Sequence, residues 1–363
     1  MDFAFSEAEE ELRTEVRQWL NADIGDRAEW LAHEGGVDLA LWRRLGQQGW
    51  LGLAAPTAYG GQGRSVLELA VVAEELGRAL APVPFLPGIL LAAEALLCFG
   101  SEAQKKTYLP DLLVGKTVGT LAYFEQGQFE SGLIAAEFAN GTLSGQKSPV
   151  LDGDSADFAV VLVREGAGLS LVIADLQQAG VVRKSLASLD LLHGQAEIGF
   201  DHATAERLGA VGEGEAMLQQ LFDRAAVVLS FMQLGGAEQA LTVSVEYAKT
   251  RQQFGNPIGA FQATKHKLAN MYSTQELARG NCYYGLWTLS EGDAALPEAA
   301  CLARISAGEA YLFNGQEAVQ VHGGVGFTWG AEPHLHMRAS KLMAAVLGSC
   351  DEWREKLIAR DPY

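Results

Sequence analysis

The chain has 363 residues, of which 48% are hydrophobic and 20% charged, so it is long enough to bury a large core. That composition excludes a disordered chain and a small disulfide-bonded scaffold. The 27 basic and 45 acidic side chains give a net charge of −18, which repels polyphosphates and anionic lipid surfaces. We therefore expect neither nucleic acid nor a membrane as a partner.

The cysteines and the N-terminal residues predict the cellular compartment. Four cysteines lack CxxC and metal-ligand spacing, which favours free thiols and no metal site. The first residues carry neither a basic segment nor an apolar leader. We expect a cytoplasmic protein.

Helical periodicity dominates the N-terminal part of the chain. Apolar residues such as Leu12 and Val16 recur at helical spacing, and Ser6 with Glu9 has the spacing of a capping box. We predict an N-terminal helical domain over residues 1–115.

The middle of the chain changes to short apolar runs separated by Gly and Asp turns. The runs at 158–163 and 169–174 are typical of antiparallel strands. We predict a middle β domain over residues 116–205.

Helical periodicity returns over residues 206–363, for which we predict a C-terminal helical bundle. The predicted helices span 215–250, 261–291, 297–322 and 333–359. Helices, then strands, then helices indicate an α+β fold with segregated domains and exclude an alternating doubly wound sheet.

Three stretches could bind a ligand through backbone or charge. Residues 59–63 (YGGQG) and 322–327 (HGGVGF) are rich in glycine, which permits close approach of a phosphate, although both also suit a tight turn. Residues 251–262 place Arg251, an aromatic ring and an amide around one turn, a combination that suits a pyrophosphate. Arg251 could instead complement the dipole at a helix C-terminus.

These stretches resemble the acyl-CoA dehydrogenase family, and the resemblance covers nearly the whole chain. The segments that carry it are 49–56 (GWLGLAAP), 59–63, 74–78 (EELGR), 247–255 (YAKTRQQFG), 258–262 (IGAFQ) and 318–327 (AVQVHGGVGF). The resemblance implies an N-terminal helical domain, a middle β domain and a C-terminal four-helix bundle, assembled as a tetramer. It also implies FAD as cofactor and an acyl-CoA substrate.

The resemblance further implies which residues contact FAD across a dimer interface. They would reach the pyrophosphate and adenosine of a flavin held mainly by the neighbouring subunit. The matching residues are Arg251, Phe254, Gln262, Gln320, Gly323 and Gly324.

The family's catalytic base is missing. Its reaction removes an α-proton from an acyl thioester while hydride leaves the β-carbon for the flavin, so it requires a carboxylate. One family position for this glutamate lies six residues beyond the Lys of Arg-x-x-Lys, and here it is Leu347; the other is Ala225. Asp223 lies about 200° from Ala225 on a helix and should point elsewhere.

The flavin-ring side departs from the family pattern as well. The loop expected against the ring corresponds to 124–131 (FEQGQFES), in which only Glu125 and Gly127 match the family. The Trp-Ile-Thr-type segment corresponds to 149–151 (PVL), which lacks the aromatic ring and the hydroxyl. The losses are confined to one side of the cofactor site.

This pattern is closest to the base-lacking subunits of heteromeric bacterial steroid-CoA dehydrogenases. Our hypothesis is a subunit that supplies the FAD pyrophosphate and adenosine half-site to a base-bearing, homologous partner in a heterotetramer. Two alternatives remain open. One is a non-enzymatic homo-oligomer that has lost flavin, and the other is a homotetrameric enzyme with a displaced base.

Other ionisable residues suggest no second site. We interpret Glu74 and Glu75 as part of a solvated helix face. His334 and His336 stand two residues apart, which places them on different helix faces, and we expect them in solvent or at an interface.

Overall fold

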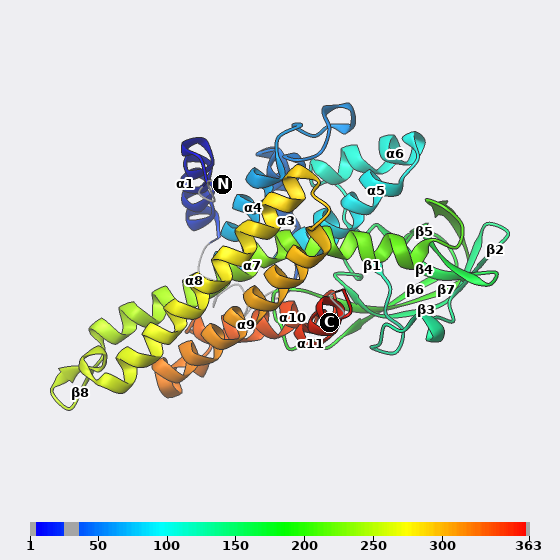
Figure 1. The fold of residues 1–363 in the computed structure, drawn as a ribbon. Coiled ribbons are helices and arrows are strands. Elements are labelled where there is room, and N and C mark those ends of the chain that lie inside the picture. Colours follow the sequence, from blue (N-terminus) through cyan, green and yellow to red (C-terminus); the bar gives the residue numbers. More distant parts are fainter. Residues whose placement is uncertain (1–4, 25–35, 361–363) are drawn as a thin grey trace.

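The computed structural model describes residues 5–24 and 36–360. An N-terminal group of helices, a β barrel and a C-terminal group of long helices follow one another along the chain (Figure 1). The predicted α+β fold with helices, strands and helices in that order is confirmed. Within the described ranges, no helix is both long enough and apolar enough to cross a bilayer.

The N-terminal helices follow from amphipathic patterns with local caps. Helix α1 (Glu7–Asp23) begins with the predicted capping box, in which the Ser6 amide donates to the Glu9 carboxylate at 2.6 Å. Leu12, Val16 and Leu20, four residues apart, form its buried face. The elements that follow are α3 (Leu39–Gln47), η1 (Trp50–Gly52), η2 (Thr57–Tyr59), α4 (Val66–Arg78), the π-helical segment η3 (Leu86–Ala93), α5 (Glu94–Phe99) and α6 (Glu102–Leu113).

The strands of the middle region close into a barrel. They are β1 (Gly119–Ala122), β2 (Glu137–Ala139), β3 (Thr142–Leu151), β4 (Phe158–Glu165), β5 (Gly168–Asp175), β6 (Val181–Leu186) and β7 (Gln195–Leu208), and the 3₁₀ turn η4 (Ser131–Leu133) lies between β1 and β2. Pairing runs from β4 through β2, β3, β7 and β5 back to β4, which closes the ring.

The predicted strands at 158–163 and 169–174 are β4 and β5, and they pair antiparallel as expected. Antiparallel pairing does not hold throughout the barrel: β1 pairs parallel with β4, and β2 pairs antiparallel with β3 but parallel with β4. A tight turn forces neighbouring strands to run antiparallel, whereas β1 and β2 reach β4 through longer connections that leave the direction open.

The C-terminal region contains the long helices. Its elements are α7 (Gly214–Thr250), β8 (Gln252–Gln253), β9 (Asn256–Pro257), η5 (Ile258–Ala260), α8 (Gln262–Glu291), α9 (Leu296–His322), η6 (Gly323–Phe327), α10 (Pro333–Ala345) and α11 (Cys350–Ile358). Helices α7 to α10 pack together as a bundle. The first three predicted helices match α7, α8 and α9 closely.

The fourth predicted helix, 333–359, is wrong because it is two helices. Leu347 and Gly348 have φ of +64° and +93°, which end α10. The buried Arg304 donates to the carbonyl oxygens of Met343 and Val346, each at 2.6 Å, and so satisfies groups that a continuing helix would use. A new capping box at Ser349 then starts α11.

Glycines bring α4 and α7 into backbone contact. A Cβ at Gly77 would lie 1.9 Å from the Met232 carbonyl oxygen, and a Cβ at Gly235 would lie 1.9 Å from the Glu74 carbonyl oxygen. Only glycine fits at either position. The N-terminal helices are therefore packed directly onto the C-terminal bundle.

The solvated helix face predicted for Glu74 and Glu75 is wrong. Both side chains are buried between α1, α4 and the bundle. Arg13 and Arg279 lie 2.8 and 3.0 Å from the Glu74 carboxylate, and Arg17 lies 2.7 Å from that of Glu75. Burial raises the pKa of Glu74 even though both arginines oppose that shift. The pair of acids joins α1 and α8 to α4.

The two histidines of α10 are also buried within the chain, where solvent or an interface was expected. His336 Nδ1 lies 3.0 Å from the Tyr311 hydroxyl, and Nε2 lies 3.1 Å from the Glu332 carboxylate. The ring of His334 packs edge-on against Trp329. Tyr311 belongs to α9, whereas Glu332 is the N-cap of α10 and Trp329 lies in the turn before it. Burial of the two histidines depends on this packing, which spacing along α10 does not reveal.

Candidate functional site

The turn between α7 and α8 presents three of the predicted FAD contacts. Arg251 ends α7, and Gln262 is the first residue of α8. Between them, Phe254 has φ of +51° and is 90% exposed, and Phe261 lies edge-on to its ring. Nearly all of this aromatic ring is therefore open to solvent, where it could contact a ligand or another chain.

The other three predicted contacts lie where α9 ends. Gln320, Gly323 and Gly324 are exposed, and a Cβ at either glycine would meet no atom within 4 Å. Tyr247 of α7 stacks on His322 of α9 at 4.2 Å, which holds the two helix ends together. Figure 1 shows the β8 hairpin and the end of α9 at the same end of the bundle. All six predicted contacts therefore lie at one exposed end.

The guanidinium of Arg251 is available to an external anion. Its backbone amide donates to the Tyr247 carbonyl oxygen at 2.8 Å, and its carbonyl oxygen accepts from the Ile258 amide at 2.8 Å. Within residues 5–24 and 36–360, its side chain has neither an ion pair nor a hydrogen bond. The backbone thus fixes the position of the residue while the charge stays unpaired.

A cavity of about 480 Å³ lies between the barrel and the junction of α10 and α11. The two segments that depart from the family pattern, 124–131 and 149–151, both contribute to its wall. Its lining residues are Leu91, Leu121, Tyr123, Phe124, Gly127, Gln128, Phe129, Glu130, Pro149, Leu151, Gln195, Leu342, Ala345, Val346, Gly348, Ser349 and Glu352. Most of this wall is apolar.

Glu125, which matches the family loop, fixes the conformation of that loop through hydrogen bonds and an ion pair. Its carboxylate accepts from the amides of Ala135 and Ala136 at 2.8 and 3.0 Å and pairs with the buried Lys147 at 2.6 Å. Burial opposes the charge of Glu125, but these donors lower its pKa. A carboxylate so stabilised is a poor proton acceptor.

The backbone at Leu347, one of the two usual base positions, is held by hydrogen bonds. Its amide donates to the Tyr123 hydroxyl at 3.3 Å, and its carbonyl oxygen accepts from the Trp353 indole at 2.8 Å. Its side chain is 3% exposed. The side chain is therefore buried, and the backbone is held on both sides.

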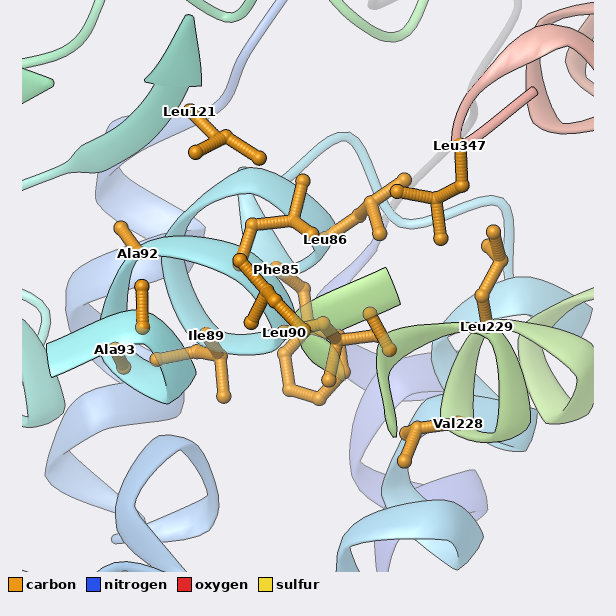
Figure 2. Packing of buried hydrophobic residues seen from close by; sticks show 14 of the residues in the cluster. Phe85, Leu86, Ile89, Leu90, Ala92, Ala93, Leu121, Val228, Leu229 and Leu347 are labelled. Atoms are coloured by element: carbon orange, nitrogen blue, oxygen red, sulfur yellow. The ribbon is translucent and has the colours of Figure 1, made fainter. Parts of the chain in front are cut away.

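The side chain of Leu347 belongs to what we call the leucine cluster, formed with Leu86, Leu90 and Leu229. Figure 2 shows leucines from η3, α7 and the α10–α11 junction pointing toward one another. Each is at most 3% exposed. Leucine side chains thus occupy the space beside the usual base position.

Ala225, the second usual base position, faces elsewhere. It lines a different cavity, of about 580 Å³, together with Glu94 and Arg224. Asp223 pairs with Lys356 on α11, and a second cation, Arg360, lies 3.8 Å away. The expectation that Asp223 points away from Ala225 is therefore confirmed.

Two carboxylates that sequence reasoning missed, Glu130 and Glu352, line the 480 Å³ cavity. Glu352 Oε2 accepts from the Ser349 amide at 2.6 Å and from its hydroxyl at 2.8 Å, so it completes the capping box of α11. The Ser-x-x-Glu pattern at 349–352 was the signal for this helix start. Only the fold places that cap at the cavity.

Comparisons with known proteins agree with this fold. Residues 6–116 match the acyl-CoA dehydrogenase N-terminal domain, and residues 212–361 match the acyl-CoA dehydrogenase C-terminal domain. The acyl-CoA dehydrogenase IpdE2 of Mycolicibacterium smegmatis is 32% identical over 361 residues, which cover 98% of this chain and 99% of the relative.

Two solved structures are similar over nearly the whole chain. One chain in the structure of the ChsE4-ChsE5 complex from Mycobacterium tuberculosis is 29% identical with a TM-score of 0.90, and the match covers 100% of this chain and 100% of that chain. The Tcur3481-Tcur3483 steroid ACAD is 29% identical with a TM-score of 0.88, covering 98% of each. The two domain matches and the full-length identity establish that this chain belongs to the acyl-CoA dehydrogenase family, whose members are FAD-dependent oxidoreductases.

Proposed function

We propose that this chain is one subunit of an acyl-CoA dehydrogenase built from unlike chains. It supplies residues for the pyrophosphate and adenosine half of an FAD site, and a homologous partner supplies the carboxylate base and the acyl pocket. The FAD bound between the two chains would accept the hydride. This chain's own ring-side half-site does not dehydrogenate acyl-CoA.

The leucine cluster is the observation that carries this proposal. A base must reach the α-carbon of the thioester, yet Leu347 has no ionisable atom and packs against Leu86 and Leu229. The acyl group would need the volume that these side chains fill, and opening it would expose closely packed apolar surface. The usual base positions therefore carry no carboxylate, and leucine side chains fill the space beside Leu347.

The exposed end of the bundle supports the other half of the proposal. The unpaired guanidinium of Arg251 suits a pyrophosphate, since charge-assisted hydrogen bonds to phosphate are among the stronger polar contacts. The open edges at Gly323 and Gly324 allow the backbone to approach a ligand closely. In a second chain these residues would complete a site that their own chain leaves unfilled.

Two relatives support the choice of partner and substrate. One of them was solved as a complex, ChsE4-ChsE5, and the other is described as a steroid ACAD. By analogy we propose a heterotetramer and a steroid side-chain CoA thioester as substrate. The proposed partner carries a glutamate at the position that is Leu347 or Ala225 here.

Co-expression with such a partner is the direct test. We expect a stable complex that contains flavin and oxidises acyl-CoA, measured by absorbance and with an artificial electron acceptor. Replacing the partner's glutamate by glutamine should abolish turnover while flavin stays bound. The same complex with Glu352→Gln in this chain should keep its activity, because we assign Glu352 to the helix cap.

Three outcomes would overturn the proposal. If the chain alone binds one FAD per subunit and oxidises acyl-CoA, it is an ordinary homo-oligomeric enzyme. Loss of turnover in Glu352→Gln with flavin retained would identify Glu352 as a displaced base. A colourless homo-oligomer that binds no partner would favour the non-enzymatic alternative.

A further inference from the structure

A buried cluster of three ionisable side chains lies outside both cavities, in the barrel. Asp152 directly follows β3, and Asp190 and His193 belong to the connection between β6 and β7, residues 187–194. Each side chain is at most 6% exposed. The proposed subunit role uses none of these three groups.

His193 and Asp152 join two segments that are distant in the sequence. His193 Nδ1 lies 3.1 Å from Asp152 Oδ2, and Asp152 Oδ1 accepts from the Gly194 amide at 2.8 Å. The Asp152 amide donates in return to the Gly194 carbonyl oxygen at 2.8 Å. These bonds fasten the connection 187–194 to the turn after β3.

Asp190 is the incompletely satisfied member of the cluster. Its Oδ1 accepts from the Leu192 amide at a long 3.4 Å, and its buried Oδ2 has no hydrogen-bond partner within residues 5–24 and 36–360. Burial raises the pKa of Asp190, and the nearby His193 opposes that rise. A buried carboxylate in this position depends on a neighbouring cation.

His193 is the cation that the two carboxylates share. Burial opposes the charge of its imidazole, but Asp152 and Asp190 raise its pKa to about 9. The ordinary pKa of histidine is about 6.5. The stabilisation from the charged ring is therefore fully present below about pH 6.5 and is lost as the pH rises through about 9.

The other charged groups around these segments are bonded elsewhere. Arg183 of β6 donates to the Ala156 carbonyl oxygen at 2.8 Å, and Arg338 of α10 donates to that of Leu189 at 3.1 Å. Neither arginine forms an ion pair in the part of the chain that the structure describes. Asp154, near Gly194, accepts from the Ser185 hydroxyl. Neutralisation of the two buried acids is thus left to His193.

We propose that protonated His193 is a pH-sensitive latch that holds the connection 187–194 closed against the turn after β3. Loss of the proton leaves two carboxylates in a buried site without a cation, and the connection moves outward to hydrate them. This device works in the chain by itself and does not depend on the proposed subunit role.

The position of the latch gives its opening two consequences. Leu151 and Gln195, which adjoin the bonded residues Asp152 and Gly194, line the 480 Å³ cavity. The Leu189 carbonyl oxygen, within the connection, is the acceptor for Arg338 of α10. Opening therefore loosens one wall of that cavity and a contact between the barrel and α10.

Hydrogen–deuterium exchange of the purified protein, measured by mass spectrometry at pH 7 and pH 10, tests the latch. Labelling times are scaled for the faster intrinsic exchange at pH 10. The protection of the peptide covering 187–194 should fall at least about tenfold at pH 10, whereas peptides from β4 and β5 should keep theirs. This comparison needs no variant, so it decides even if a substitution prevents folding.

His193→Gln removes the charge and keeps a polar side chain. Its connection should already be unprotected at pH 7 and change little at pH 10. The matched control is His202→Gln, which replaces an exposed histidine of β7 that lies 4.0 Å from Asp201 and should behave like the unmodified chain.

Four outcomes would overturn the proposal. They are unchanged protection of 187–194 between pH 7 and pH 10, an equal loss of protection in β4 and β5, full protection of the connection in His193→Gln at pH 7, and the same loss in His202→Gln as in His193→Gln.

Discussion

The two regions to which we assign the two halves of the FAD site differ in exposure and packing. At the end of the bundle, Arg251, Phe254 and Gly323 are exposed, and the described residues leave the guanidinium of Arg251 unpaired. At the α10–α11 junction, Leu347 is locked by backbone bonds and packed in the leucine cluster. The residues of the first region are exposed to solvent, whereas the side chain of Leu347 in the second is covered by the chain's own core. Such a difference is expected when a cofactor site is shared between unlike subunits.

The largest expected effect comes from placing the missing base in the closed region. Leu347→Glu would bury a carboxylate without a partner, because the nearby Arg304 already donates to backbone carbonyls. We expect a loss of about 3 kcal/mol or more in the free energy of unfolding, measured with urea. Leu347→Met, which keeps the apolar volume, should cost less than about 1.5 kcal/mol. Equal stability of the two variants would mean that the leucine cluster opens to water.

The next effect concerns binding at the open end. Arg251→Ala should weaken flavin retention in the complex by about 1.5–3 kcal/mol, since it removes a charged hydrogen bond to phosphate. Its melting temperature should not change. Lys249→Ala, which removes a cation paired with Glu246 on the same helix end, is the control. If both variants lose flavin to the same extent, Arg251 contributes only through its general positive charge.

Substitutions at two neighbouring glycines distinguish the effect of backbone strain from the effect of losing contact with a ligand. Gly323 has φ of +63°, so Gly323→Ala should lower the free energy of unfolding by about 1 kcal/mol. Gly324→Ala should be nearly neutral for stability because its φ is not positive and its surroundings are open. Both should reduce the flavin content of the complex if the backbone contacts the cofactor. Full flavin content in Gly324→Ala would contradict that contact.

Only a small effect on folding is expected at the second base position. Ala225 faces the 580 Å³ cavity, so the side chain of Ala225→Glu has space and the neighbouring Arg224 as a partner. We expect a folded variant, within about 1 kcal/mol of the parent, that shows no dehydrogenase activity. Activity in the isolated variant would show that a flavin ring and a thioester reach Ala225, and the contrast between the open and closed regions would fail.

Local patterns in the sequence were sufficient to locate the longest helices and two of the barrel strands. Periodicity located α7, α8 and α9 and the strands β4 and β5, and the capping box at Ser6 marked the start of α1. The absence of a carboxylate at positions 225 and 347 is likewise a property of the sequence alone. Each of these features depends on the types of residues that lie a few positions apart, and these are fixed by the sequence before the chain folds.

The tertiary structure decided which side chains are buried and which segments meet. Glu74 and Glu75 were predicted to be solvated because, apart from Arg78 on α4 itself, the arginines paired with them come from α1 and α8, far away in the sequence. The break after α10 depends on Arg304 of α9, and the leucine cluster joins η3, α7 and the α10–α11 junction. Local patterns report the spacing of residues within a segment. Burial and charge neutralisation depend on contacts between distant segments, and only the fold creates those contacts.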